Sequence, residues 1–131
     1  GQPLAGIEDT LKKLKRGSDV PRVVFTKGEL LDQKNKYHKS GLSAYFDDII
    51  VVEDKTIAAY KQLCTHFGVQ IEELLMIGNS FKSDIEPVLK QGGCAIHIPF
   101  HTVWQHEMVE EYPHENLIVL DSFSELTKII L

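Results

Sequence analysis

Three polar side chains each follow a separate apolar stretch of this sequence: Thr26, Lys55 and Asp84. A hydroxyl, an ammonium group and a carboxylate are suited to hydrogen-bonding a phosphoryl oxygen, neutralising its charge and holding a hard cation such as Mg²⁺. If the apolar stretches are parallel strands of one sheet, the side chains that follow them converge at one sheet edge. The sequence therefore predicts a pocket for a phosphate and a metal.

Each of these residues also has a simpler structural interpretation. Thr26 taken alone is best explained as a helix N-cap, because Thr is a preferred cap residue. Lys55 could equally be a solvated lysine, and Asp84 could stabilise the N-terminus of the helix that it opens. Their order, their positions after strands and the Gly-Asn-Ser turn at residues 78–80 together favour the functional interpretation.

Strand and helix patterns alternate along the chain and would position these residues. Apolar strands are expected at residues 22–26, 48–53, 74–78, 94–98 and 117–120. Amphipathic helices are expected at residues 7–17, 30–39, 56–67, 84–91 and 122–131. This alternation predicts an α/β domain with a mostly parallel sheet. Residues 99–116 are expected to form a long loop with one helical turn near residues 103–108.

Local signals predict where several helices begin. A Thr or Ser followed three residues later by Glu is the spacing of a capping box, and it occurs at Thr26, Ser83 and Ser122. Gly68 is expected to end the helix at residues 56–67. Pro87 is compatible with a helix because it would fall in the first turn.

Size and charge limit the class of partner. The chain has 131 residues, of which 43% are hydrophobic and 25% charged, and this predicts one globular domain over residues 1–131. A net charge of -5 without a Lys/Arg-rich run argues against nucleic acid or an anionic membrane surface as the partner. Two cysteines without CxxC spacing, and no signal peptide or membrane-length apolar run, predict a cytoplasmic protein.

Four histidines lie in or beside the expected long loop, at positions 97, 101, 106 and 114. Their spacing matches no structural zinc site, and no cysteine lies among them. Zinc ligation is therefore the less favoured interpretation.

Three segments resemble the second, third and fourth motifs of the haloacid dehalogenase-like (HAD) hydrolases, in the subfamily whose cap lies between the first and second motifs. They are residues 23–28 (Val-Val-Phe-Thr-Lys-Gly), 53–56 (Glu-Asp-Lys-Thr) and 78–85 (Gly-Asn-Ser-Phe-Lys-Ser-Asp-Ile). Residues 3–11 also resemble the segment by which this family returns from cap to core. The resemblance implies a three-layer Rossmannoid core and a Mg²⁺-dependent phosphatase that forms an aspartyl-phosphate on a small phosphorylated substrate.

The resemblance also implies a role for each matched residue. Thr26 would hydrogen-bond the transferring phosphoryl group, and Lys55 would neutralise the charge of that group and of the nucleophile. Lys27 and Gly28 would present backbone amides to the phosphate.

The sequence departs from the family in its acidic residues. Asp84 would ligate Mg²⁺, but Asn79 stands where many relatives have Asp, which leaves one metal carboxylate instead of two. The family's first motif is an Asp-x-Asp segment that supplies the nucleophile and the general acid/base, and nothing in this sequence matches it. The strand before that motif is the central one in the family's sheet, so this strand and the cap are expected to be lacking here.

The chain is therefore expected to be the C-terminal core portion of such a phosphatase and to be inactive alone. A shortened piece, a proteolytic product and a naturally shortened gene all remain open as its origin. The place of the central strand could be filled by a retained N-terminal segment, by a strand exchanged in a homodimer, or by closure of its neighbours, with the first two favoured.

Two other functions remain open. One is a non-catalytic phosphate-binding or assembly module of HAD-like fold. The other is a 2-haloacid dehalogenase-type hydrolase, which shares the Asp nucleophile but needs no Mg²⁺. Asp84 and Thr26 weigh against the second.

Overall fold

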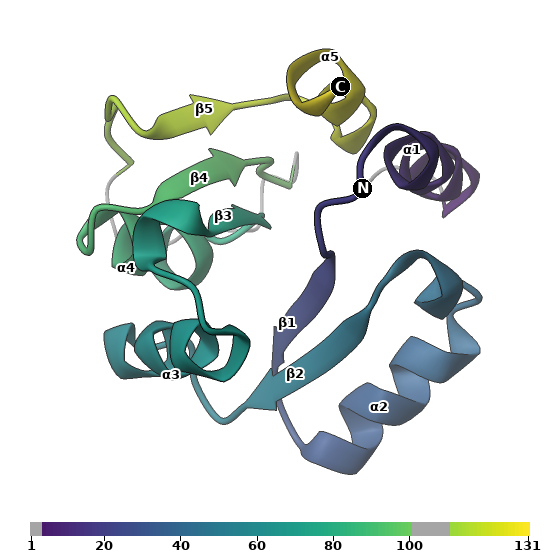
Figure 1. Ribbon diagram of the computed structural model, residues 1–131, viewed down its shortest axis with the longest axis horizontal. Coiled ribbons are helices and arrows are strands. Elements are labelled where there is room, and N and C mark those ends of the chain that lie inside the picture. The colour runs from purple at the N-terminus through teal and green to yellow at the C-terminus, as the bar shows by residue number, and fades with distance from the viewer. Residues whose placement is uncertain (1–3, 101–110) are drawn as a thin grey trace. The chain divides into compact units, whose positions relative to one another are not determined.

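A computed structural model describes residues 4–100 and 111–131, which divide into two compact units (Figure 1). The continuous unit comprises residues 55–121, and the discontinuous unit combines the residues up to 54 with residues 122–131. The helical turn predicted near residues 103–108, with His101 and His106, lies outside the described residues. None of the helices in the described ranges is both long and apolar enough to cross a membrane.

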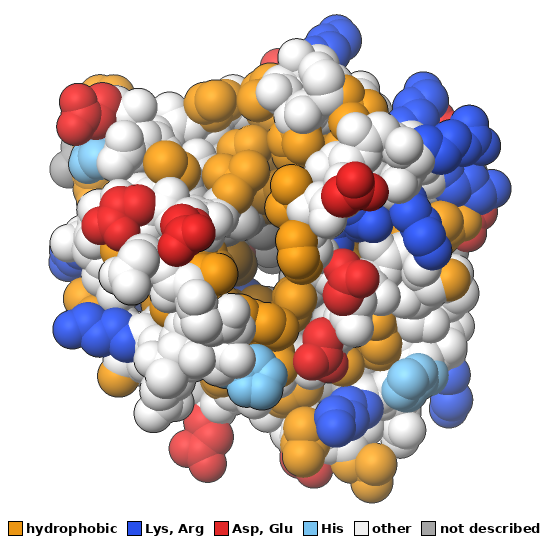
Figure 2. Space-filling model, viewed as in Figure 1, with side chains coloured by type: hydrophobic (Ala, Val, Ile, Leu, Met, Phe, Trp, Pro, Cys, Tyr) orange, Lys and Arg blue, Asp and Glu red, His pale blue; other side chains and the backbone are white. Residues whose placement is uncertain are grey.

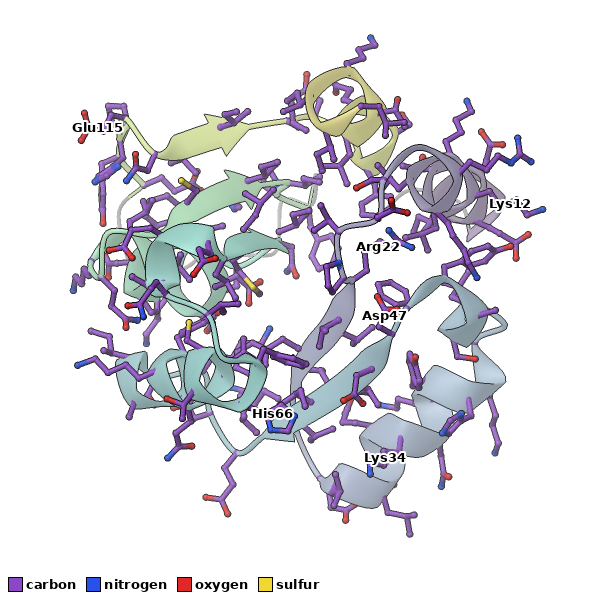
Figure 3. All side chains as sticks on the ribbon, viewed as in Figure 1. Lys12, Arg22, Lys34, Asp47, His66 and Glu115 are labelled. Carbon is purple, nitrogen blue, oxygen red and sulfur yellow. The ribbon has the colours of Figure 1, made fainter. Side chains whose placement is uncertain are left out.

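The discontinuous unit contains a two-stranded parallel sheet in which Val23 lies opposite Asp48. Two hydrogen bonds join the residues that immediately precede the two strands, Arg22 and Asp47. The Arg22 N–H donates to the Asp47 carboxylate at 2.7 Å, and the Asp47 N–H donates to the Arg22 carbonyl at 2.7 Å (Figure 3). The elements are β1 (Val23–Lys27), α2 (Leu30–Lys39), η1 (Ser43–Tyr45) and β2 (Asp48–Val52).

The first and last helices of the described residues meet within the discontinuous unit. Helix α1 (Leu4–Gly17) packs against η4 (Phe123–Glu125) and α5 (Leu126–Ile130). Leu11 and Leu14 are buried, as the amphipathic spacing predicts. Figure 2 shows Lys and Arg side chains gathered over α1, whose basic residues are Lys12, Lys13, Lys15 and Arg16.

The continuous unit contains a three-stranded parallel sheet in the order β3-β4-β5. A cluster of Phe81, Ile85, Leu89 and Ala95 forms its apolar core. The elements are α3 (Ile57–Phe67), η2 (Ile71–Glu73), β3 (Leu75–Gly78), η3 (Phe81–Ile85), α4 (Glu86–Leu89), β4 (Cys94–His97) and β5 (Leu117–Val119).

Every strand pair in the described ranges is parallel, which confirms the predicted α/β class. The strands form two sheets, in which β1 has β2 as its strand neighbour and β3 has β4. No further strand of the described residues pairs with β1 or β3.

Two of the three predicted capping boxes are wrong. Thr26 lies within β1, and α2 is capped instead by Glu29, whose carboxylate accepts from the Asp32 N–H at 2.8 Å. Ser83 lies inside the π-helical turn η3, which is capped by Ser80. Helix α4 therefore begins later than expected.

Two further predictions about helix ends are confirmed, at Gly68 and at Ser122. Thr56 caps α3 by accepting from the Ala59 N–H, and Gly68 ends this helix with a φ of 66°, a left-handed conformation that favours glycine. The capping box at Ser122 has both of its hydrogen bonds.

Candidate functional site

Lys55 and Asp84 form a buried ion pair in the continuous unit. The Lys55 Nζ lies 2.7 Å from the Asp84 Oδ1, and the two side chains are 14% and 4% exposed. Lys55 immediately precedes the cap of α3, and Asp84 lies in η3, directly beyond β3. A charge-assisted hydrogen bond between buried groups is strong, and the loss of either partner leaves the other as an uncompensated charge.

The turn after β3 closes around the Asp84 carboxylate. The Ser80 N–H donates to the Asp84 Oδ2 at 3.1 Å, and the Asp84 N–H donates to the Ser80 carbonyl at 2.8 Å. A Cβ atom at Gly78 would overlap the Asp84 side chain. Glycine is therefore required at position 78 because of this close approach.

The π-helical turn η3 explains how a carboxylate comes to be buried here. Its Phe81 and Ile85 side chains are buried in the apolar core, and these anchor the turn on either side of the exposed Lys82. The Glu86 N–H donates to the Phe81 carbonyl, which is the wide spacing of a π turn. Such turns are frequent at functional sites.

Two further buried side chains hold this turn. The Tyr60 hydroxyl, on α3, donates to the Ser83 carbonyl at 2.7 Å. The His97 Nε2, at the end of β4, lies 3.0 Å from the Asn79 carbonyl oxygen. Both residues are 0% exposed.

Sequence reasoning did not assign these roles. The spacing of residues 56–67 puts Tyr60 on the apolar face of the expected helix, and the sequence suggests for His97 only the less favoured role of a zinc ligand. A polar ring at an otherwise apolar position was the one available signal.

Burial raises the pKa of Tyr60 well above its ordinary value of 10.0, and the negative charge of Asp84 raises it further. Both effects disfavour the phenolate. Tyr60 therefore remains a hydrogen-bond donor to Ser83 throughout the neutral range.

The sequence-predicted phosphate turn lies in the discontinuous unit, at the end of β1. The Thr26 hydroxyl donates to the Gln33 Oε1 at 3.3 Å, and the Gly28 N–H donates to the Val52 carbonyl at 3.0 Å. The Lys27 Nζ lies 4.0 Å from the Asp54 Oδ1, and both side chains are exposed. An anion that used the Gly28 amide would have to share or displace the bond to Val52.

The described groups do not by themselves fit a magnesium site. Mg²⁺ prefers octahedral oxygen ligands, and the turn offers one carboxylate, at Asp84, with an amide side chain at Asn79. The Asp84 oxygens already accept from Lys55 and Ser80, and the Lys55 charge 2.7 Å away repels a second cation. Across residues 4–100 and 111–131, no three His, Cys, Asp or Glu side chains cluster to hold a metal ion.

Comparison with solved structures finds three informative similarities. A haloacid dehalogenase-like family hydrolase from Xanthomonas campestris is 32% identical, with a TM-score of 0.78, over 96% of this chain and 52% of that one. A HAD phosphatase from Thermococcus onnurineus is 23% identical, with a TM-score of 0.71, over 93% and 55%. YfnB from Bacillus subtilis, bound to magnesium, is 20% identical, with a TM-score of 0.73, over 93% and 53%.

The chain thus spans about half the length of these three proteins. No protein-family model and no curated protein matches it. The motif-bearing segments, the parallel α/β fold and the similarity to the Xanthomonas hydrolase nevertheless agree with one another. The chain belongs to the haloacid dehalogenase-like superfamily of hydrolases.

Proposed function

We propose that this chain is the C-terminal core portion of a Mg²⁺-dependent phosphatase that acts through an aspartyl-phosphate intermediate. The observation that carries the proposal is the buried pair of Lys55 and Asp84 beside the Gly-Asn-Ser turn. A preorganised ammonium group in a poorly solvated place stabilises charge that develops on a transferring phosphoryl group. The similarity to a protein described as a HAD phosphatase supports the same reaction class.

The remaining groups of the reaction are assigned from the family's motifs. Thr26 would donate a hydrogen bond to the phosphoryl group, and the Lys27 and Gly28 turn would contact it through the backbone. A carboxylate nucleophile and a proton donor for the leaving group are also required. We assign both to an Asp-x-Asp segment outside this 131-residue sequence, together with the oxygen ligands that would complete the metal shell.

The test is complementation. The chain alone is expected to leave p-nitrophenyl phosphate intact in the presence of Mg²⁺. Addition of a peptide that carries the family's first motif and its strand should raise the melting temperature and produce Mg²⁺-dependent turnover. The matched control is the same peptide with its nucleophilic Asp replaced by Asn, which should stabilise the chain without restoring turnover.

Two outcomes would overturn the proposal. Stabilisation by the peptide without any turnover would favour a non-catalytic phosphate-binding module. Turnover by the chain alone, abolished by a chelator, would mean that a carboxylate of this sequence is the nucleophile, and Asp54 would be the first to replace.

A 2-haloacid dehalogenase-type reaction is the second candidate, favoured by one observation. Both oxygens of Asp84 are already hydrogen-bonded, and Asn79 offers no second carboxylate for a metal. The complemented chain should therefore also be assayed with 2-chloropropionate in the presence of a chelator. Halide release under these conditions, without phosphatase activity, would establish the dehalogenase reaction instead.

A further inference from the structure

We propose that His97 is a positioning residue for this site, because it holds the peptide group whose other side supports Asp84. The inference rests on the proposed function, since it assigns a role at the same site to a residue outside the family's motifs. His97 lies at the carboxyl end of β4, opposite Gly78 in the strand register.

The contact with Asn79 determines which nitrogen of the imidazole carries the proton. The His97 Nε2 lies 3.0 Å from the Asn79 carbonyl oxygen, which has no hydrogen to donate. Nε2 must therefore be the donor. The backbone ladder between β3 and β4 extends to the bond from the Ile98 N–H to the Gly78 carbonyl at 2.9 Å. The imidazole adds one further hydrogen bond, at the residue where the strand turns away.

The Asn79 carbonyl and the Ser80 N–H belong to the same peptide group. That group is planar, and its C=O and N–H point in opposite directions. On one side the carbonyl accepts from His97, and on the other the Ser80 N–H donates to the Asp84 Oδ2 at 3.1 Å. Rotation of this peptide would break both bonds together, so His97 fixes the direction from which Asp84 is held.

The hydrogen bonds continue from this peptide to the charged pair. His97 donates to Asn79, Ser80 donates to Asp84, and Lys55 donates to the other oxygen of the same carboxylate at 2.7 Å. Bonds in such a series polarise one another in a poorly solvated interior. The imidazole therefore acts on the position of Asp84, and through it on Lys55, without touching either side chain.

The imidazole is held firmly, but at a cost in free energy. Phe81 packs edge-on against its ring, with centroids 5.5 Å apart and planes at 70°. The His97 Nδ1 is buried without a hydrogen-bond partner among the described residues, 3.6 Å from the Glu111 Oε1. A buried polar atom left unpartnered is unfavourable, and a leucine would avoid that cost. The Nε2–H donor to Asn79 is an advantage that leucine could not supply.

The test compares two amide substitutions of His97 in the 131-residue chain. Glutamine places its side-chain NH₂ near the position of Nε2 and retains a donor for Asn79. Asparagine ends near the position of Nδ1 and leaves Asn79 without its donor. The control is His114→Asn, because the His114 Nδ1 accepts from the Asn116 N–H away from this turn.

The readout is amide hydrogen exchange at Ser80, measured by NMR relative to Met76 in β3. His97→Asn should accelerate exchange at Ser80 by about fivefold or more relative to Met76, the effect of losing one net hydrogen bond. His97→Gln and the control should remain close to the wild-type ratio. Equal acceleration at Ser80 and Met76 in the Asn variant, or a failure of Gln to rescue Ser80, would overturn the proposal in favour of simple packing.

A second measurement needs no variant and so remains decisive if the Asn variant does not fold. A long-range proton–nitrogen spectrum of the unsubstituted chain should show His97 protonated at Nε2. Protonation at Nδ1 alone would overturn the proposal, because Nε2 could then not donate. Neither measurement uses a substrate, so a failure of phosphatase complementation with these results intact would refute the proposed reaction and not the positioning of the Asn79 peptide.

Discussion

At the scale of single residues, the pairing of Lys55 with Asp84 makes their energies interdependent. Each side chain is largely buried, so Lys55→Met or Asp84→Asn removes the opposite charge that lies beside the remaining one and should lower the free energy of unfolding by about 3–5 kcal/mol. The double variant should lose much less free energy of unfolding than the two single variants lose together. Urea unfolding of the four proteins measures this coupling.

The matched control for this comparison of single and double variants is Lys27→Met. Lys27 lies 4.0 Å from Asp54 with both side chains exposed, so its removal should change the free energy of unfolding by less than about 1 kcal/mol. Strict additivity of the Lys55 and Asp84 substitutions would mean that the two charges do not stabilise each other.

Tyr60 should make stability depend on pH in the alkaline range. Its pKa is raised by burial and then by Asp84, so above about pH 10 the unfolded chain releases a proton that the folded chain retains. The stability that the Tyr60 phenol adds to the wild type has its full value below about pH 10 and decreases as the pH rises further. Tyr60→Phe lacks this dependence and also lacks the bond to the Ser83 carbonyl.

We therefore expect the wild type to be more stable than Tyr60→Phe by about 1 kcal/mol at pH 8 and the difference to shrink toward pH 11. Urea unfolding of both proteins across that range tests this. A constant difference would show that Tyr60 ionises equally in both states.

At the scale of elements, two glycines are required for different reasons. Gly78 has no room for a Cβ beside Asp84, so Gly78→Ala should cost about 1–3 kcal/mol and perturb the amide of Ser80. Gly68 has free space but a φ of 66°, so Gly68→Ala should cost about 1 kcal/mol and leave Ser80 unchanged. Thermal unfolding and amide spectra distinguish the two, and identical spectra would contradict the steric explanation for Gly78.

Helix ends that depend on neighbouring residues were predictable from the sequence, as at Gly68 and Ser122. The prediction failed at Ser83, because Ser80 is also a good cap and the Asp84 carboxylate bonds back to the Ser80 N–H. It failed at Thr26 because strand pairing extends one residue further, to Lys27. Spacing alone does not show which of two competing hydrogen-bond patterns tertiary packing selects.

The same limit applies to the site. Lys55 and Asp84 were recognisable because charged residues after apolar strands are unusual enough to need an explanation. Tyr60 and His97 act on backbone carbonyls, at Ser83 and Asn79, and any residue could supply those carbonyls. No sequence pattern marks such contacts, so the supporting residues became visible only in the folded chain.

At the scale of the whole molecule, the sheets constrain the state of the protein in solution. The end strands of a sheet are prone to pair with other strands. We propose that an N-terminal segment, or a strand exchanged with a second copy, provides such pairing for β1 or β3. Sedimentation at increasing concentration should show a dimer in the second case and, in the first, a monomer that binds the first-motif peptide. A monomer that does not bind the peptide would contradict both.

The packing of α1 against α5 has a consequence for the order of events during synthesis. Residues 55–121 are contiguous, so this unit can complete its contacts as soon as Asp121 has left the ribosome. The other unit must wait for α5, although its first helix was made more than a hundred residues earlier. Until α5 is available, the apolar face of α1, with Leu11 and Leu14, lacks this partner, so the protection of α1 from chaperones and proteases depends on a contact made late in the chain.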